Sequence, residues 1–235
     1  MNKPFLTAEW KYLAMINYRI DPAILLSYLP AKTLLDTHEG IHYVSLVGFL
    51  FLNTKVLGVK IPFHVNFEEV NLRFYVKREV NGEWRRGVVF IREIVPKHAI
   101  AFIANTLYKE HYSAMRMRHH IAGEKSAVSF GWKHSGRWDE LKVATGNVKM
   151  PLKPGSKEEF IAEHYWGYNR IDENRTTEYK VEHPKWNYYT VDDYTVDCRF
   201  SELYGTDFAF LTNSKPLSVF MAEGSAVNIG HGSKL

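Results

Sequence analysis

The dipeptide Asn81-Gly82 stands between two long segments with strand character. The segment before it, NFEEVNLRFYVKREV, alternates apolar residues with other residues, and the segment after it, WRRGVVFIREIV, is rich in β-branched residues. A tight two-residue turn needs positive φ at both positions, which asparagine and glycine adopt most easily. The sequence therefore predicts an antiparallel β-hairpin here and a fold based on an antiparallel sheet.

Other segments indicate that strands dominate the chain. The run from Tyr12 to Ile20 predicts a strand, and Asp21 followed by Pro22 predicts the start of a short helix over AILLSYL. The run from Ile41 to Leu52, IHYVSLVGFLFL, is apolar on both faces and predicts a central strand of the core. Further strands are expected in MRMRHHIAG, KSAVSFGWKH, RWDELKVATG, EYKVEH, YYTVDDYTVDCRF and PLSVFMAE.

Helices are expected in two further places. The segment KHAIAFIANTLY, after Pro96, has apolar residues at helical spacing and predicts an amphipathic helix that ends near Tyr108. Ser156 and Glu159 form a capping box at the start of SKEEFIAEHY. The residues after Gly230 are expected to be loose. The fold class is thus α+β, mainly antiparallel β, with a few short helices.

Composition favours one soluble domain over residues 1–235. The chain is 46% hydrophobic and 24% charged, which is average for a globular protein. Its net charge of +4 falls short of a dedicated nucleic-acid binder. The single cysteine, Cys198, suits a reducing compartment, and no segment approaches the ~18 apolar residues of a membrane span. We expect a cytoplasmic protein without nucleic-acid or membrane partners. The sequence leaves open whether the chain forms a homo-oligomer.

Well-known catalytic and metal motifs are missing from the sequence. There is no Walker A loop, no dinucleotide-binding G-x-G-x-x-G, no H-E-x-x-H and no nucleophile elbow. His111, Met115 and His119 are spaced by four, but this segment is better explained as a turn that leads into a strand. We therefore expect neither a metal nor a cofactor.

Two clusters combine several kinds of polar group. The first lies on the hairpin and consists of Glu68, Glu69, Arg73, Arg85, Arg86, Arg92 and Glu93. Its simpler and favoured explanation is a solvated outer face with ion pairs across the strands. The second is YKEHY, residues 108–112, where an amine, a carboxylate, an imidazole and two phenols follow an apolar helix. Such a mixture is typical of a pocket that tunes proton affinity.

The order of these elements resembles the acetoacetate decarboxylase-like superfamily and, within it, the YqjF-like family of uncharacterised conserved proteins. The resemblance rests on Trp10, on YRIDPAILLSYLP, on VNLRFYV with its partner GVVFIREIV, on the helix before YKEHY and on SKEEFIAEHYWGY. It spans nearly the whole chain. It implies a single domain built around a closed or nearly closed β-barrel with a pocket inside.

The resemblance does not carry over the decarboxylase chemistry. Decarboxylases of this superfamily place Pro-Lys-Lys after the corresponding helix and form a Schiff base through the first lysine. The matching stretch here reads Glu110-His111-Tyr112, and Lys109 comes too early for that register. The family's arginine near the first strand falls on Lys11, and its carboxylate on the apolar strand falls on Ser45. Decarboxylation through an imine is therefore not expected.

Three hypotheses arise for function. The first is a pocket that binds a small organic acid, which is anionic, or a carbonyl compound. In it Arg73 or Arg92 donates hydrogen bonds to the ligand. The second is a cofactor-free lyase or isomerase in which His111 acts as acid or base, Glu110 orients it and Tyr112 donates to an enolate-like oxygen. The third is a barrel filled by aromatic side chains that serves as an interaction protein. The resemblance implies a pocket lined by Tyr18, Tyr43, Arg73, Arg92, Lys109, Glu110, His111 and Tyr112.

Overall fold

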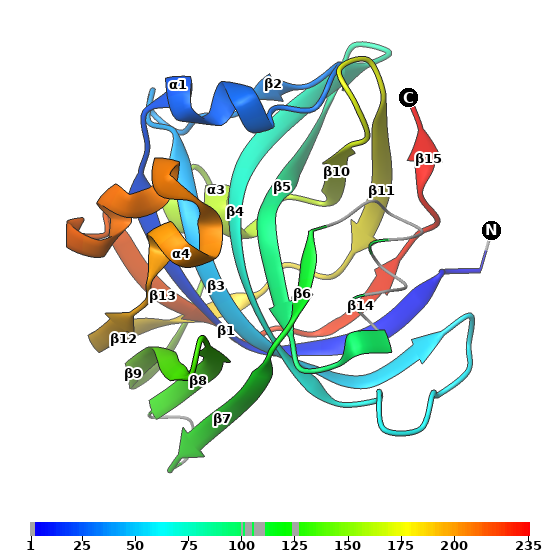
Figure 1. Cartoon of the computed structure of the whole chain (residues 1–235). Coiled ribbons are helices and arrows are strands. Elements are labelled where there is room, and N and C mark those ends of the chain that lie inside the picture. The colour runs from blue at the N-terminus through cyan, green and yellow to red at the C-terminus, as the bar shows by residue number, and fades with distance from the viewer. Residues whose placement is uncertain (1–2, 100, 102–104, 106–110, 124–126) are drawn as a thin grey trace.

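Seven strands form a closed β-barrel in the computed structural model of this chain, which describes residues 3–99, 101, 105, 111–123 and 127–235 (Figure 1). In neighbour order they are β1 (Leu6–Arg19), β3 (Tyr43–Val56), β4 (Phe67–Val80), β5 (Glu83–Val95), β10 (Trp166–Arg170), β11 (Thr176–Glu182) and β14 (Ala226–Ile229). Strand β14 pairs with β1 and closes the ring. Only β5 and β10 pair in parallel within this ring. The expected mainly antiparallel barrel is confirmed.

A second set of strands extends the sheet outward from β1. Its order is β13 (Ser218–Ala222), β12 (Asn187–Asp197), β9 (Arg137–Pro151), β8 (Ala127–His134) and β7 (Arg116–Ala122). Strand β1 serves both parts, because it pairs with β14 over Leu6–Glu9 and with β13 over Leu13–Asn17. Between these stretches the register against β3 shifts by one residue, and Tyr12 has a φ of 58°. A bulge of this kind bends a strand, and here it lies where β1 passes from one partner to the other.

The hairpin of β4 and β5 forms as predicted. Asn81 and Gly82 have φ angles of 53° and 82°, as the turn requires. The strand predicted over Ile41–Leu52 corresponds to β3, which is buried on both faces over most of its length. The helix predicted after Asp21 begins at Pro22 as α1 (Pro22–Leu25) and continues as the 3-10 helix η1 (Leu26–Tyr28).

The remaining short elements cover the barrel. Helix α3 (Lys157–Ala162) begins at the predicted cap, where Ser156 Oγ accepts a hydrogen bond from Glu159 N at 3.1 Å. Strand β2 (Leu34–Leu35) pairs with β4, and β6 (Tyr112–Ala114) pairs in parallel with β5. The helix expected over KHAIAFIANTLY falls largely outside the described residues. No helix in the described ranges is long and apolar enough to cross a membrane.

Two expectations about the C-terminal part are wrong. The last residues are ordered: β15 (Ser233–Lys234) pairs with β11, and Leu235 N donates to Thr176 O at 2.8 Å. The sequence analysis also missed α4 (Phe200–Tyr204) and the 3-10 helix η2 (Thr206–Asn213). Phe200, Leu203 and Tyr204 are buried at helical spacing, a signal that identifies α4 in hindsight.

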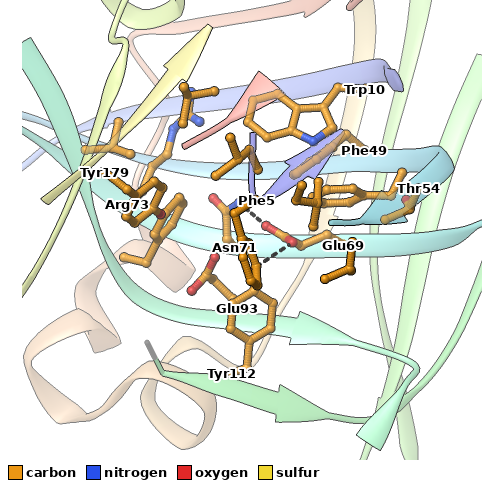
Figure 2. A pocket seen from close by; sticks show the side chains of 18 of the residues that line it. Phe5, Trp10, Phe49, Thr54, Glu69, Asn71, Arg73, Glu93, Tyr112 and Tyr179 are labelled. Carbon is orange, nitrogen blue, oxygen red and sulfur yellow. Dashed lines mark hydrogen bonds between the residues drawn. The ribbon is translucent and has the colours of Figure 1, made fainter. Parts of the chain in front are cut away.

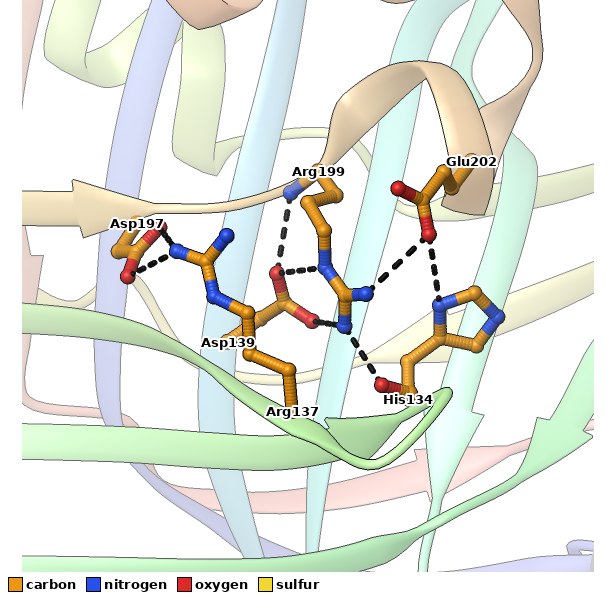
Figure 3. Close-up of polar contacts among 6 residues, drawn as sticks. All are labelled: His134, Arg137, Asp139, Asp197, Arg199 and Glu202. Atoms are coloured by element: carbon orange, nitrogen blue, oxygen red, sulfur yellow. Dashed lines mark hydrogen bonds and ion pairs between the residues drawn. The ribbon is translucent and has the colours of Figure 1, made fainter.

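An ion-pair cluster fixes α4 against strands β8 and β9 (Figure 3). The carboxylate of Asp139, which has no exposed surface, accepts hydrogen bonds from the backbone N, Nε and Nη2 of Arg199 at 3.1, 3.1 and 2.7 Å. Arg199 Nη2 also donates to His134 O at 2.6 Å, and its Nη1 contacts Glu202 at 3.2 Å. These contacts explain the position of α4, including its last residue Tyr204, against the outside of the barrel.

The two largest hydrophobic cores occupy the two sides of the barrel wall. One includes Leu46, Phe74, Phe200 and Phe208 and fills the space between the barrel, the second set of strands and helices α4 and η2. The other includes Val47, Phe49 and Tyr75 of the barrel strands together with Phe160 and Ile161 of α3. On β4, the residues Val70, Leu72, Phe74 and Val76 belong to the first core. The opposite face of β4 therefore points into the barrel.

Candidate functional site

A cavity of about 170 Å³ lies inside the barrel (Figure 2). Every barrel strand contributes to its lining, through Trp10, Phe49, Glu69, Phe90, Trp166, Tyr179 and Ile229 among others. Most of the lining is apolar and aromatic, and five of its polar residues lie together on β4, β5 and β6. This arrangement is typical of a small-molecule site, in which a few polar groups orient a ligand within an apolar enclosure.

The polar part of the wall is formed by β4, β5 and β6 (Figure 2). Glu69, Asn71 and Arg73 alternate along β4, Glu93 lies directly opposite Asn71 on β5, and Tyr112 begins β6. Glu69, Asn71 and Glu93 are each at most 2% exposed. The expectation of a solvated outer face is thus wrong for Glu69 and Glu93, because closure of the barrel turns this face of the hairpin inward.

Glu69 is the centre of a hydrogen-bonded group in this wall. Tyr112 Oη donates to Glu69 Oε2 at 3.0 Å, and Asn71 Nδ2 donates to Glu69 Oε1 at 2.8 Å. Tyr112 is itself held by Asn105, which accepts from its backbone N at 2.8 Å and donates to its backbone O at 3.0 Å. A phenol and a carboxylate are therefore held in fixed contact at the edge of an apolar cavity, an arrangement suited to moving a proton.

Arg73 lines the same cavity with spare hydrogen-bond donors. Its Nη2 is 3.5 Å from Ile161 O, at the limit of a hydrogen bond, and its Nε is buried with no partner among the described residues. The guanidinium carbon lies 5.8 Å from the centre of the Tyr75 ring. A guanidinium has five N–H donors in a fixed plane, so Arg73 has the capacity to bind an oxygen of a ligand.

His164 also lines the cavity, and the sequence analysis did not select it. Its Nε2 is 3.4 Å from Asp36 Oδ2, which also accepts from Arg86 Nε at 2.6 Å. Burial lowers the pKa of His164 to about 4, against the opposing effect of Asp36, so the imidazole is neutral at pH 7. Burial raises the pKa of Asp36, but hydrogen bonds from His164 and Arg86 outweigh it and hold that pKa well below its usual value.

The residues selected from the sequence divide between two sides of the barrel wall. Arg73 and Tyr112 line the barrel cavity. Arg92 and His111 line a second cavity outside the barrel, of about 430 Å³, between β5, β10, η1 and α4. His111 is exposed and does not reach the barrel cavity.

A bulge in β5 causes the separation of the two arginines. Leu72 pairs with Arg92 but Arg73 pairs with Phe90, so Ile91 is an extra residue in β5. An extra residue reverses the inward and outward alternation of the residues that come after it in the strand. Arg92 consequently points outward and Glu93 points inward. The sequence carries no local signal for this bulge.

Two further selected residues, Tyr18 and Tyr43, lie elsewhere. Tyr18 is buried in the outer core, 6.2 Å from the Phe200 ring centre, and burial raises its pKa. Tyr43 is buried beside Phe160 at 5.8 Å between ring centres, and neither tyrosine lines the barrel cavity. Lys109 and Glu110 lie outside the described residues. Within the described ranges no lysine lines the barrel cavity, and no cluster of three or more histidine, cysteine or acidic residues is arranged to hold a metal.

Similar folds occur among solved structures. The acetoacetate decarboxylase from Legionella pneumophila subsp. pneumophila strain Philadelphia 1 has a TM-score of 0.70 at 12% identity, over 100% of this chain and 90% of the other. An acetoacetate decarboxylase-like enzyme from Sphingomonas wittichii RW1 has a TM-score of 0.65 at 12% identity, over 100% and 94%. The enduracididine biosynthesis enzyme MppR, complexed with pyruvate, has a TM-score of 0.66 at 13% identity, over 100% and 91%.

These similarities establish an acetoacetate decarboxylase-like fold. No curated protein sequence matches the chain significantly. The model of the family DUF2071, described as an uncharacterized conserved protein, matches residues 7–226. That match covers most of the 235 residues, and the chain therefore belongs to the DUF2071 family.

Proposed function

We propose that the barrel cavity binds a small organic acid or carbonyl compound with a largely hydrocarbon body. The observation that carries this proposal is Arg73, whose buried Nε lacks a partner among the described residues at the wall of a largely apolar cavity. A buried donor without an acceptor is costly, and a ligand oxygen removes that cost. The apolar lining takes up the rest of the molecule.

The size of the cavity limits the ligand. An apolar cavity of about 150 Å³ accommodates a benzene molecule, and the barrel cavity is about 170 Å³. The ligand is therefore a small molecule of about six to eight non-hydrogen atoms. A cavity of this size also argues against a barrel filled completely by aromatic side chains. The complex of the similarly folded MppR with pyruvate supports a ligand of the 2-oxo acid type.

Binding experiments with matched ligands test this proposal. Calorimetric titration with straight-chain 2-oxo acids and carboxylic acids of three to seven carbons is compared with primary alcohols of equal length. We expect the acids to bind and the alcohols to bind at least tenfold more weakly, because a hydrogen bond to a charged group contributes roughly 1.5–3 kcal/mol. Equal binding of acids and alcohols would contradict an oxygen-binding role for Arg73.

An Arg73→Gln variant locates the interaction. It should lose acid binding by about tenfold or more while alcohol binding stays unchanged. The matched control is Arg116→Gln, which removes the same charge from an exposed position on β7. If Arg73→Gln binds the acids as tightly as the unmodified protein, the acid group lies elsewhere.

A second candidate function is cofactor-free proton transfer of the lyase or isomerase type. The hydrogen bond of 3.0 Å between Tyr112 and Glu69 favours it, because the pair lies in the wall that also contains Arg73. The Glu69 carboxylate would take a proton from the carbon next to the ligand carbonyl. The electron pair of that C–H bond would move to the carbonyl oxygen, where Arg73 stabilises the enolate. Return of the proton to carbon completes the cycle.

Deuterium exchange distinguishes catalysis from binding alone. A 2-oxo acid that binds is incubated with the protein in D₂O, and loss of its C3 proton signal is followed by NMR. We expect faster exchange than in buffer and loss of that acceleration in Glu69→Gln. Glu79→Gln, an exposed glutamate on the same strand, is the control. An unchanged exchange rate in Glu69→Gln would leave binding as the function.

A further inference from the structure

The second cavity has the composition of an anion site. It lies outside the barrel, is about 430 Å³ in volume, and is lined by both polar and apolar side chains. Arg92, Arg170 and His111 contribute to it, and none of its described lining residues is acidic. Asp207 accepts a hydrogen bond from the lining residue Tyr28 at 3.1 Å and is not itself part of the described lining.

Arg92 is the strongest reason to expect a ligand there. Its guanidinium has no hydrogen bond or ion pair with any described residue, although its side chain is only partly exposed. Arg170 differs, because its Nη1 donates a hydrogen bond to Ser27 O at 2.5 Å. The other N–H donors of its guanidinium remain available to a ligand. No described lining residue supplies a carboxylate between the two guanidinium groups. Like charges repel each other, and an anion that binds both removes the repulsion.

Tyr204 gives an independent second observation. It is 4% exposed and lines the cavity, and its hydroxyl is buried without a hydrogen-bond partner among the described residues. Arg92 lines the same cavity as Tyr204. Burial raises the pKa of this phenol, and the charge of Arg92 acts against that rise. The phenol therefore keeps its proton at neutral pH and is a donor without an acceptor.

We propose that this cavity is a second ligand site, which binds a polar organic oxyanion through Arg92, Arg170 and the hydroxyl of Tyr204. The planar guanidinium donors match a carboxylate or a phosphate, and the shared chemistry is an oxyanion on an organic body. The cavity is much larger than an inorganic anion needs, since a water molecule occupies about 30 Å³ in the liquid. The site is separate from the barrel cavity, and its test does not depend on the function proposed for that cavity.

Calorimetry on the full chain tests the site with four probes: inorganic phosphate, phenyl phosphate, benzoate and benzyl alcohol. We expect phenyl phosphate or benzoate to bind, the better of the two identifying the oxyanion. Inorganic phosphate should bind more weakly than phenyl phosphate, and benzyl alcohol should not bind here. No binding by any anionic probe at millimolar concentration would overturn the proposal.

Variants assign the binding to the cavity. Arg92→Gln should weaken binding of the better anionic probe at least tenfold. Arg116→Gln, at an exposed position on β7, should leave that affinity unchanged. Tyr204→Phe removes only the hydroxyl and should weaken binding of the same probe several-fold. This variant keeps the test valid if Arg92→Gln folds poorly. An equal loss in Arg92→Gln and Arg116→Gln would show diffuse charge attraction and overturn the proposal, as would full affinity in both Arg92→Gln and Tyr204→Phe.

Discussion

Arg92 lies directly opposite Leu72 on the neighbouring strand, whereas Arg73 lies opposite Phe90. Leu72 belongs to the core outside the barrel, and Phe90 lines the cavity inside it. The extra residue in β5, Ile91, thus places two arginines of one hairpin on opposite sides of the barrel wall. Each arginine therefore lines a different cavity, and each of the two proposed ligand sites contains a guanidinium group.

The buried pair of Asp139 and Arg199 should be far more important for stability than the exposed pair of Arg137 and Asp197 (Figure 3). Asp139→Asn leaves Arg199, whose side chain is 17% exposed, with the exposed carboxylate of Glu202 as its remaining charge partner among the described residues. Breaking a buried pair costs roughly 3–5 kcal/mol. Arg137→Gln disrupts a pair in which both side chains are 54% exposed, and this should cost less than about 1 kcal/mol. Urea unfolding of both variants measures the difference, and equal losses would refute this account of the cluster.

His164 should make the protein less stable in acid. Its pKa is about 4 in the folded protein, below the value near 6.5 of a free histidine. The unfolded chain therefore takes up a proton first as pH falls, and the stabilisation present above pH 6.5 is lost progressively toward pH 4. By pH 4.5 this loss is on the order of 2–3 kcal/mol.

Urea unfolding at pH 7.5 and pH 4.5 checks this dependence. His164→Gln should reduce the difference between the two pH values by about that amount, on the order of 2–3 kcal/mol. Part of the dependence should remain, because burial also lowers the pKa values of His42 and His183. His120→Gln, at an exposed position on β7, is the control and should show the dependence of the unmodified protein. The same dependence in His164→Gln would assign the effect to other groups.

Local signals allowed much of the fold to be predicted. The Asn81-Gly82 turn, the Asp21-Pro22 helix start and the Ser156 cap act through neighbouring residues, so each appears in the sequence and in the structure. Closure of the barrel depends on pairing between β1 and β14, which lie at opposite ends of the chain. No local pattern specifies such a contact, and only the family resemblance indicated it.

The site was predicted less completely for the same reason. Arg73 and Tyr112 were selected and line the barrel cavity. Glu69 and Glu93 were assigned to a solvated face, because alternation along a strand does not say which face the barrel encloses. His164 was missed since it follows α3 far along the chain, and only the tertiary fold brings it to Asp36.

Removing the hydroxyl of Tyr112 should lower the free energy of unfolding, because this hydroxyl holds Glu69 in the wall of the barrel cavity. Tyr112→Phe takes a donor from Glu69, and the loss of a hydrogen bond to a buried carboxylate costs roughly 1–3 kcal/mol. Tyr188→Phe is the control, since no described residue makes a hydrogen bond with its side chain and its ring packs on Phe220. Unfolding in urea should show the loss for Tyr112→Phe only. A loss of the same size in both variants would mean that the Glu69 contact contributes little.

Glycine at position 167 should be required for full stability, because the ring of Tyr179 lies against this residue. The two residues are opposite each other on β10 and β11, and both line the barrel cavity. A Cβ at position 167 would lie 2.1 Å from Tyr179 Cζ, so Gly167→Ala must displace the ring. We expect a loss of roughly 1–3 kcal/mol, as is usual for overpacking. In a Tyr179→Leu background the ring is absent, and the same substitution should cost much less.

Unfolding of the four proteins of this double-mutant cycle measures the coupling between the two residues. Gly146→Ala is the control, because a Cβ there would have its nearest atom, Thr190 Oγ1, at 3.4 Å, an ordinary contact distance. That variant should stay within about 0.5 kcal/mol of the unmodified protein. An equal cost of Gly167→Ala with and without the Tyr179 ring would place the strain in the β10 backbone instead. A cost confined to the background with the ring would establish that Tyr179 and Gly167 together shape this wall of the cavity.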